Sequence, residues 1–186
     1  MGKKIIVTGT PGSGKTTILS KLSRFTVVSL GTEIQNLTKQ QVERDRIRSS
    51  LSNVNIKSLR AMALREIDAR KEDLIIDTHT AIKAGNRYIA GLTAKDMKEL
   101  HDVKAIIYVD ATADDILLRR SMDKSRSRDL DTKQEIKEQR SINMSLATFY
   151  MQELEVPLYI IKNKQGKVES AAKEVQAAIS DAMSRE

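Results

Sequence analysis

The sequence predicts an α/β fold, a five-stranded parallel sheet flanked by helices, and three observations lead to it. Short β-branched runs alternate with amphipathic helical patterns along the 186 residues, as they do in βαβ units. A glycine-rich loop separates the first run from the first helical pattern. Hydrophobic residues make up 40% and charged residues 31% of the chain, which suits one globular core. We therefore expect a single domain over residues 1–186.

Five apolar, β-branched runs of four to six residues have the composition of buried parallel strands. Each run ends at a glycine, a carboxylate or a turn. The third run is the most informative, because it places Asp77 at the C-terminal end of a strand, the edge where α/β proteins bind ligands. In chain order the predicted strands are residues 4–8 before Gly9, 26–30 before Gly31, 74–77, 105–110 and 158–161.

Helices are predicted where apolar residues recur every three or four positions. Thr93 with Asp96, and Thr112 with Asp115, are capping patterns that start two of them. Residues 84–86 are predicted as a turn that leads into the helix at Thr93. The predicted helices cover residues 15–24, a polar stretch from 32 to about 55, 56–67, the helices that follow Thr93 and Thr112, 133–155 before Pro157, and 168–183.

The glycine-rich loop matches the phosphate-binding pattern G-x-x-x-x-G-K-[ST] without a mismatch and lies between a predicted strand and a predicted helix. Its backbone N–H groups and the helix N-terminus favour a phosphate anion. Lys15 should reach the β- and γ-phosphates, Thr16 should ligate Mg²⁺, and Thr17 should lie near the α-phosphate. The predicted nucleotide-binding residues are Gly9, Thr10, Pro11, Gly12, Ser13, Gly14, Lys15, Thr16 and Thr17.

Three classes of P-loop protein remain open: a kinase of a small acceptor, a guanine-nucleotide switch and a nucleic-acid-associated ATPase. Asn163-Lys164-Gln165-Gly166 is similar to a guanine-recognition motif but lacks its carboxylate, which weakens the second class. The net charge of +7 suits either polyphosphate substrates or nucleic acid. A kinase of a phosphate acceptor is favoured, since no residue stands out as a general base. Asp77 could still serve as one.

Cationic side chains gather in two segments. The first, a predicted lid over about residues 119–132, contains Arg119, Arg120, Lys124, Arg126 and Arg128, and its arginines would close over a triphosphate. The second contains Arg44 and Arg48, whose i, i+4 spacing places them on one helical face. A solvated charged surface explains either segment as well.

Two residues follow the third predicted strand closely enough to act on the phosphates. Asp77 could hold Mg²⁺ through water, as a Walker-B acid does, or cap the following turn. His79 could orient an acceptor, although a single histidine in a loop is often structural. Thr16 and Asp77 are therefore the predicted metal residues.

Five short motifs occur in one order along the chain: residues 9–17, Leu30-Gly31-Thr32, Arg44-Asp45-x-x-Arg48, Asp77-Thr78-His79-Thr80 and Arg126-x-Arg128-Asp129. This order is similar to that of the archaeal-type adenylate kinases, which are P-loop nucleoside monophosphate kinases, and the resemblance covers essentially the whole chain. The loop before Gly91 departs from that family, because Ala84, Ala90 and Thr93 stand where prolines are usual.

The resemblance implies Mg²⁺-dependent conversion of ATP and AMP to two ADP, often by a homotrimer. It implies a monophosphate-binding insert over about residues 32–70, with Gly31, Thr32 and Arg48 on the acceptor side. Arg44 and His79 are predicted on the same side from their positions in the sequence. Lys15, Asp77, Arg120, Arg126 and Arg128 would carry the catalysis. Another small P-loop kinase, of cytidylate or shikimate type, stays an alternative, as does a nucleic-acid-associated ATPase.

Composition excludes several further classes. The chain has no cysteine, so disulfide scaffolds, thiolate metal sites and cysteine nucleophiles are excluded. We see neither a signal peptide nor a long apolar segment and expect a cytoplasmic protein with no membrane partner. No nucleic-acid partner is expected either.

Overall fold

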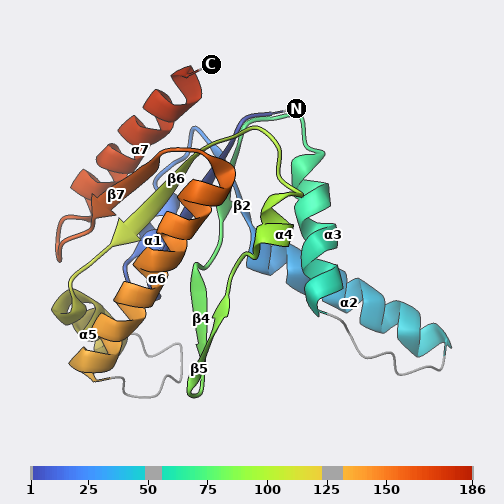
Figure 1. The fold of residues 1–186 in the computed structure, drawn as a ribbon, viewed down its shortest axis with the longest axis horizontal. Coiled ribbons are helices and arrows are strands. Elements are labelled where there is room, and N and C mark those ends of the chain that lie inside the picture. Colours follow the sequence, from blue (N-terminus) through green and yellow to red (C-terminus); the bar gives the residue numbers. More distant parts are fainter. Residues whose placement is uncertain (1, 49–55, 123–131, 186) are drawn as a thin grey trace.

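The computed structural model describes residues 2–48, 56–122 and 132–185, and of residues 40–48 and 56 it describes the backbone alone. A five-stranded parallel sheet forms the centre of the molecule (Figure 1), in the strand order β2-β3-β1-β6-β7. The prediction of five parallel strands is confirmed. The strands are β1 (Lys4–Gly9), β2 (Thr26–Ser29), β3 (Leu74–Asp77), β6 (Val103–Asp110) and β7 (Leu158–Lys162).

Helices cover both faces of this sheet, because its central strands are apolar on both sides. Ile5 and Val7 of β1 face one core, and Ile6 faces the other, as the two-residue strand period requires. The first core is closed by α1 (Lys15–Leu19) and α7 (Val168–Ser184). The second is closed by α2 (Leu30–Arg48), α3 (Ile56–Asp68), α4 (Ala94–Met97) and α6 (Lys133–Leu154).

A helix end and the phosphate loop meet at the carboxyl edge of the sheet. Helix α5 (Ala113–Met122) follows β6 and buries Ile116 against Ile136 of α6. This brings the last turn of α5, with Arg119 and Arg120, beside the loop between β1 and α1. The predicted capping box of Thr93 with Asp96 is present, and the Asp115 N–H donates to the Thr112 hydroxyl as the second predicted capping pattern requires. A further capping box, Thr132 with Glu135, begins α6 and was not predicted. The site therefore lies at the edge that the topology predicts.

Three local predictions need correction. A hairpin of β4 (Ala81–Ala84) and β5 (Arg87–Ala90) stands where we expected one turn before the helix at Thr93. Its strands are separated by Gly85-Asn86, and Gly85 has a φ of 60°, a conformation that glycine adopts without strain. Leu30 and Gly31 begin α2 instead of ending a strand. Helix α1 ends at Leu19, well before Arg24.

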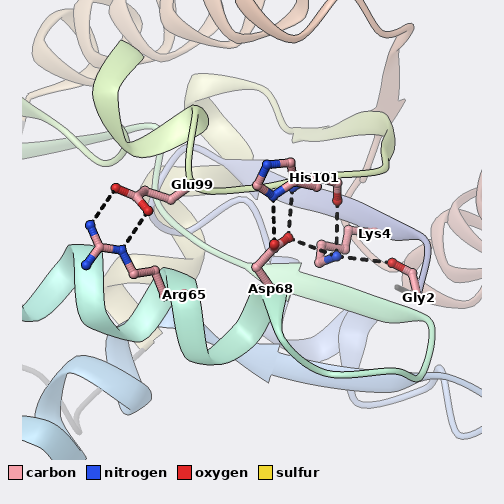
Figure 2. A network of polar contacts seen from close by, with 6 residues as sticks. All are labelled: Gly2, Lys4, Arg65, Asp68, Glu99 and His101. Atoms are coloured by element: carbon pink, nitrogen blue, oxygen red, sulfur yellow. Dashed lines mark hydrogen bonds and ion pairs between the residues drawn. The ribbon is translucent and has the colours of Figure 1, made fainter.

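The opposite edge of the sheet is held by a buried ion pair (Figure 2). The Lys4 side chain is fully buried, and its ammonium lies 3.0 Å from Asp68 Oδ1. Lys4 also donates to the carbonyls of Gly2 and His101. Asp68 Oδ2 lies 2.8 Å from Nδ1 of the His101 ring. This cluster joins β1, the end of α3 and the segment before β6.

None of the described helices is both long enough and apolar enough to cross a membrane.

Candidate active site

The phosphate loop has the backbone shape that its glycines predict. Gly12 and Gly14 have φ angles of 93° and 89°, in the left-handed region that favours glycine. The Ser13 N–H donates to the Thr10 carbonyl at 2.9 Å, and the Ile18 N–H donates to the Gly14 carbonyl at 3.1 Å. The loop therefore turns tightly into α1, whose free N-terminal N–H groups face its interior.

Space around these glycines is limited. A Cβ on Gly14 would collide with the side-chain amide of Asn163, and one on Gly12 would lie 3.1 Å from Ile116. The sequence predicted glycines here for close approach to phosphate. The structure adds that the outer surface of the loop is packed against α5 and the segment after β7.

Lys15 and Asp77 form an ion pair at the centre of the site. Lys15 begins α1 and is 8% exposed, while Asp77 ends β3, the neighbour of β1 in the sheet. Burial lowers the pKa of the Lys15 ammonium, whereas the adjacent carboxylate favours its charged form. Beyond this ion pair, Asp77 Oδ1 has no hydrogen-bond partner in the described part of the chain. The two predicted residues are thus brought together.

Arg119 and Arg120 each hold a carbonyl of the phosphate loop. Arg119 Nη1 donates to the Ser13 carbonyl at 2.9 Å, and its Nη2 donates to the Asn163 carbonyl at 2.9 Å. Arg120 Nη2 donates to the Pro11 carbonyl at 2.6 Å and to Gln139 Oε1 at 2.7 Å. Desolvation lowers the pKa of the Arg119 guanidinium. Two cations are therefore fixed at the rim of the loop.

A second layer of polar contacts supports the loop from below. The hydroxyls of Thr10 and Tyr108 lie 2.8 Å apart, and burial raises the pKa of Tyr108 to about 12. Arg140 donates two hydrogen bonds to Asp110, at 2.8 and 3.1 Å. Tyr108 and Asp110 both belong to the end of β6, so this strand positions the loop on the side opposite β3.

The segment after Asp77 is fixed by buried hydrogen bonds. Thr8 Oγ1 donates to Thr80 Oγ1 at 3.2 Å, and Thr80 Oγ1 donates to Asn143 Oδ1 at 2.5 Å. The Tyr150 hydroxyl donates to the Thr80 carbonyl at 3.0 Å. His79, immediately before Thr80, is therefore held at the carboxyl edge of the sheet.

The other predicted residues are described to different extents. Thr16, Thr17, Gly31 and Thr32 are exposed, the first two at the start of α1 and the last two at the start of α2. The backbone of Arg44 and Arg48 belongs to the end of α2, and their side chains are outside the described part. Arg126 and Arg128 lie outside the described residues.

Oxygen atoms suited to Mg²⁺ are present at the loop. The Asp77 carboxylate and the exposed Thr16 hydroxyl are hard donors of the kind Mg²⁺ prefers. Among the described residues, no group of three or more His, Cys, Asp and Glu side chains could hold a metal ion. A site with few protein ligands fits an ion that is carried largely by nucleotide phosphates.

Sequence reasoning assigned no role at the site to Asp110, Arg140 or the Asn163 side chain, which this geometry brings there, and it predicted Arg119 only as one of the lid arginines. Asn163 was considered for its place in a segment similar to a guanine-recognition motif, not for a contact with the loop. Its Nδ2 donates to the Ser13 carbonyl at 2.8 Å, across 150 residues of sequence. Position at the ends of β6 and β7 was the one signal that could have indicated Asp110 and Asn163.

Comparison with known proteins supports this description. A family model described as "AAA domain" matches residues 8–137. An adenylate kinase from Thermoplasma acidophilum is 36% identical over 176 residues, covering 91% of this chain and 94% of that protein. Adenylate kinases from Methanococcus aeolicus and Methanococcus vannielii are 31% and 32% identical. They cover 93% and 92% of this chain, and 95% of each relative is matched.

Solved structures share the fold at lower sequence identity. The crystal structure of a shikimate kinase from Bacteroides thetaiotaomicron superimposes with a TM-score of 0.61, at 18% identity, covering 96% of this chain and 98% of the other. A shikimate kinase from Acinetobacter baumannii gives the same TM-score and identity. At this identity the likeness shows the fold alone.

Proposed function

This chain belongs to the adenylate kinase family, and we propose that it catalyses the reversible, Mg²⁺-dependent transfer of a phosphoryl group from ATP to AMP, giving two ADP. Relatives that carry this name and match nearly the whole chain support the proposal. The observation that carries it in the structure is the buried Lys15–Asp77 pair against a glycine-shaped phosphate loop.

ATP would bind with its β-phosphate inside the loop, where backbone N–H groups and the α1 N-terminus face the anion. Lys15 would then exchange Asp77 for the β- and γ-phosphates, because a triphosphate offers more negative charge than one carboxylate. An ammonium at this position neutralises the charge that builds up on the phosphate oxygens during transfer.

In the transfer, an oxygen of the AMP phosphate forms a bond to the γ-phosphorus while the bond to the β–γ bridging oxygen breaks, so ADP is the leaving group. The attacking oxygen is already anionic and needs no general base. Positioning and charge neutralisation therefore suffice.

Mg²⁺ would be held by the Thr16 hydroxyl and, through water, by Asp77, and it would supply positive charge that neutralises the phosphates during transfer. Asp77 would therefore pair with Lys15 in the free protein and hold the ion once nucleotide has bound. The orientation of its carboxylate is limited by its place at the end of β3.

The acceptor and lid residues are part of the same proposal. Arg48, with Arg44, would bind the AMP phosphate, and Gly31, Thr32 and His79 would border the nucleotide. Arg120, Arg126 and Arg128 would act on the transferring phosphoryl group. A monophosphate-binding insert over about residues 32–70 and a lid over about 119–132 would bring the two sets together. The homotrimer stays a prediction from the resemblance.

The experiment that tests this function is ADP formation from Mg-ATP with AMP, CMP, UMP, GMP, shikimate or no acceptor. Strong turnover with AMP and little with the other acceptors is the expected result. Turnover with shikimate or CMP instead would overturn the choice of acceptor. Each reaction should be repeated with RNA, since ATP hydrolysis that RNA stimulates and AMP does not would indicate the nucleic-acid-associated class.

A further inference from the structure

Two side chains from distant parts of the chain converge on one carbonyl of the phosphate loop. The Ser13 carbonyl accepts a hydrogen bond from Asn163 Nδ2 at 2.8 Å and a second from Arg119 Nη1 at 2.9 Å. We call this pair of donors the Ser13 clamp. Asn163 follows β7 and Arg119 lies in the last turn of α5, so the clamp connects both elements to the loop.

The clamp is itself held in place. Arg119 Nη2 donates to the Asn163 carbonyl at 2.9 Å, and Arg119 Nε donates to Gln165 Oε1 at 3.1 Å. The Asn163 N–H donates to the Asp110 carbonyl at 2.7 Å, and Asn163 is 3% exposed. The donors therefore approach Ser13 from a fixed direction.

Because the peptide bond is planar, this contact also determines the direction of a neighbouring N–H group of the loop. The carbonyl of Ser13 and the N–H of Gly14 belong to one planar trans peptide, in which they point in opposite directions. Donors that hold the carbonyl on the outer surface of the loop therefore direct the Gly14 N–H towards its interior. Gly14 tolerates the required φ of 89° because it lacks a Cβ.

We propose that Asn163 and Arg119 are positioning residues that preorganise the phosphate loop for the triphosphate of the donor nucleotide. They act through the Ser13–Gly14 peptide and need not touch the base. The inference rests on the proposed function only in that the loop binds a nucleoside triphosphate, and it holds for any acceptor.

The test is equilibrium binding, measured by calorimetry without an acceptor, of Mg-ATP and of inorganic tripolyphosphate, which has no base. The variants are Asn163→Ala, Arg119→Gln and Arg119→Lys. Each substitution should lower the affinity for both ligands by a similar factor, about tenfold. This is the usual value of one hydrogen bond to an ionic group. Arg119→Lys keeps the charge but loses the planar fork that reaches three acceptors.

Arg65→Gln is the matched control, because Arg65 on α3 also donates two side-chain hydrogen bonds, to Glu99 in the segment after α4 and far from the loop. It should leave both affinities unchanged. The double variant Asn163→Ala with Arg119→Gln should lose less affinity than the product of the single losses, since both donors act on one carbonyl. Thermal melting of every variant separates lost binding from lost folding. Because Arg119 lies on the partly exposed surface of α5, its substitutions should disturb folding less than Asn163→Ala.

Three outcomes would overturn the clamp. Loss of ATP affinity alone, with tripolyphosphate unaffected, would mean that these side chains contact the base or ribose. Full affinity in Arg119→Lys would mean that only its charge matters. Unchanged affinity in Asn163→Ala would show that the Asn163 amide does not position the phosphate loop. If wild-type protein binds ATP but does not convert AMP, the proposed function fails and the clamp is still tested.

Discussion

At the scale of single residues, the Lys15–Asp77 pair concentrates opposite charges where water is largely excluded. A buried ion pair costs desolvation of both groups, so it is weak evidence for a contribution to stability. Its place beneath a phosphate loop explains it better, because Asp77 holds the Lys15 side chain close to the site of the phosphates until nucleotide binds.

Lys15→Ala should lower turnover by roughly 100- to 1,000-fold, because it removes a preorganised cation from the transferring phosphate. Initial rates of ADP formation from ATP and AMP measure the effect. Lys21→Ala is a matched control, since Lys21 lies just after α1 and pairs with Glu169 on the surface. This variant should keep normal turnover. Near-normal activity of Lys15→Ala would contradict the mechanism.

Asp77→Asn should raise the Mg²⁺ concentration needed for half-maximal activity by about 10- to 100-fold, the usual cost of removing an outer ligand. The measurement is a titration of free Mg²⁺ at saturating ATP and AMP, which separates metal affinity from substrate affinity. An unchanged Mg²⁺ dependence with lower kcat would show that Asp77 acts through Lys15 and not through the ion.

At the scale of elements, the loop is shaped by neighbours that come from several parts of the chain. The end of β6, the segment after β7 and the last turn of α5 each contribute a polar contact to its backbone or side chains. The opposite edge of the sheet has its own connection, in which Lys4 of β1 pairs with Asp68 at the end of α3 (Figure 2).

Asp68→Asn should lower the free energy of unfolding by about 3 kcal/mol, because it leaves the fully buried Lys4 ammonium without a carboxylate. Urea unfolding followed by circular dichroism measures this. Arg65→Gln breaks the exposed pair with Glu99 seen in the same view and should change stability little. Replacing both members, Lys4→Met with Asp68→Leu, should recover much of the loss. An Asp68→Asn variant with an unchanged free energy of unfolding would contradict the stabilising role of the Lys4–Asp68 pair.

At the scale of the whole molecule, folding changes how two carboxylates bind protons. Burial alone raises the pKa of Asp68, but hydrogen bonds from His101 and Lys4 outweigh it and leave the pKa below its usual value. For Glu135, hydrogen bonds from the backbone and hydroxyl of Thr132, and the Lys83 ammonium, lower the pKa to about 2. Both carboxylates therefore favour the folded state while they are ionised.

Stability should thus be complete above the unfolded-state pKa values and fall as the pH drops through the lower, folded-state values, from about pH 5 towards pH 2. Urea midpoints across this range measure the loss. Glu135→Gln, which keeps an acceptor for Thr132, should make the pH dependence shallower. An equally steep fall in this variant would show that other carboxylates carry the acid sensitivity.

Much of the fold was predictable because its patterns are local. The five strands were recognised from β-branched runs, and the capping patterns of Thr93 with Asp96 and of Thr112 with Asp115 each lie within four consecutive residues. The β4–β5 hairpin was missed because its ten residues include three alanines, which favour strands weakly. The two-residue Gly85-Asn86 connection between short runs was the signal that could have found it.

The site divides in the same way. By itself, the sequence determined the phosphate loop, Lys15 and the Asp77 strand end, since glycine spacing and strand periodicity are properties of neighbouring residues. Only the tertiary structure decided which side chains hold the loop. Arg119 and Asn163 contact Ser13 across 106 and 150 residues of sequence. Lys4 and Asp68 are also far apart in the sequence, so no local pattern indicates their buried ion pair. Those contacts depend on the order of strands in the sheet, which brings distant segments to one edge.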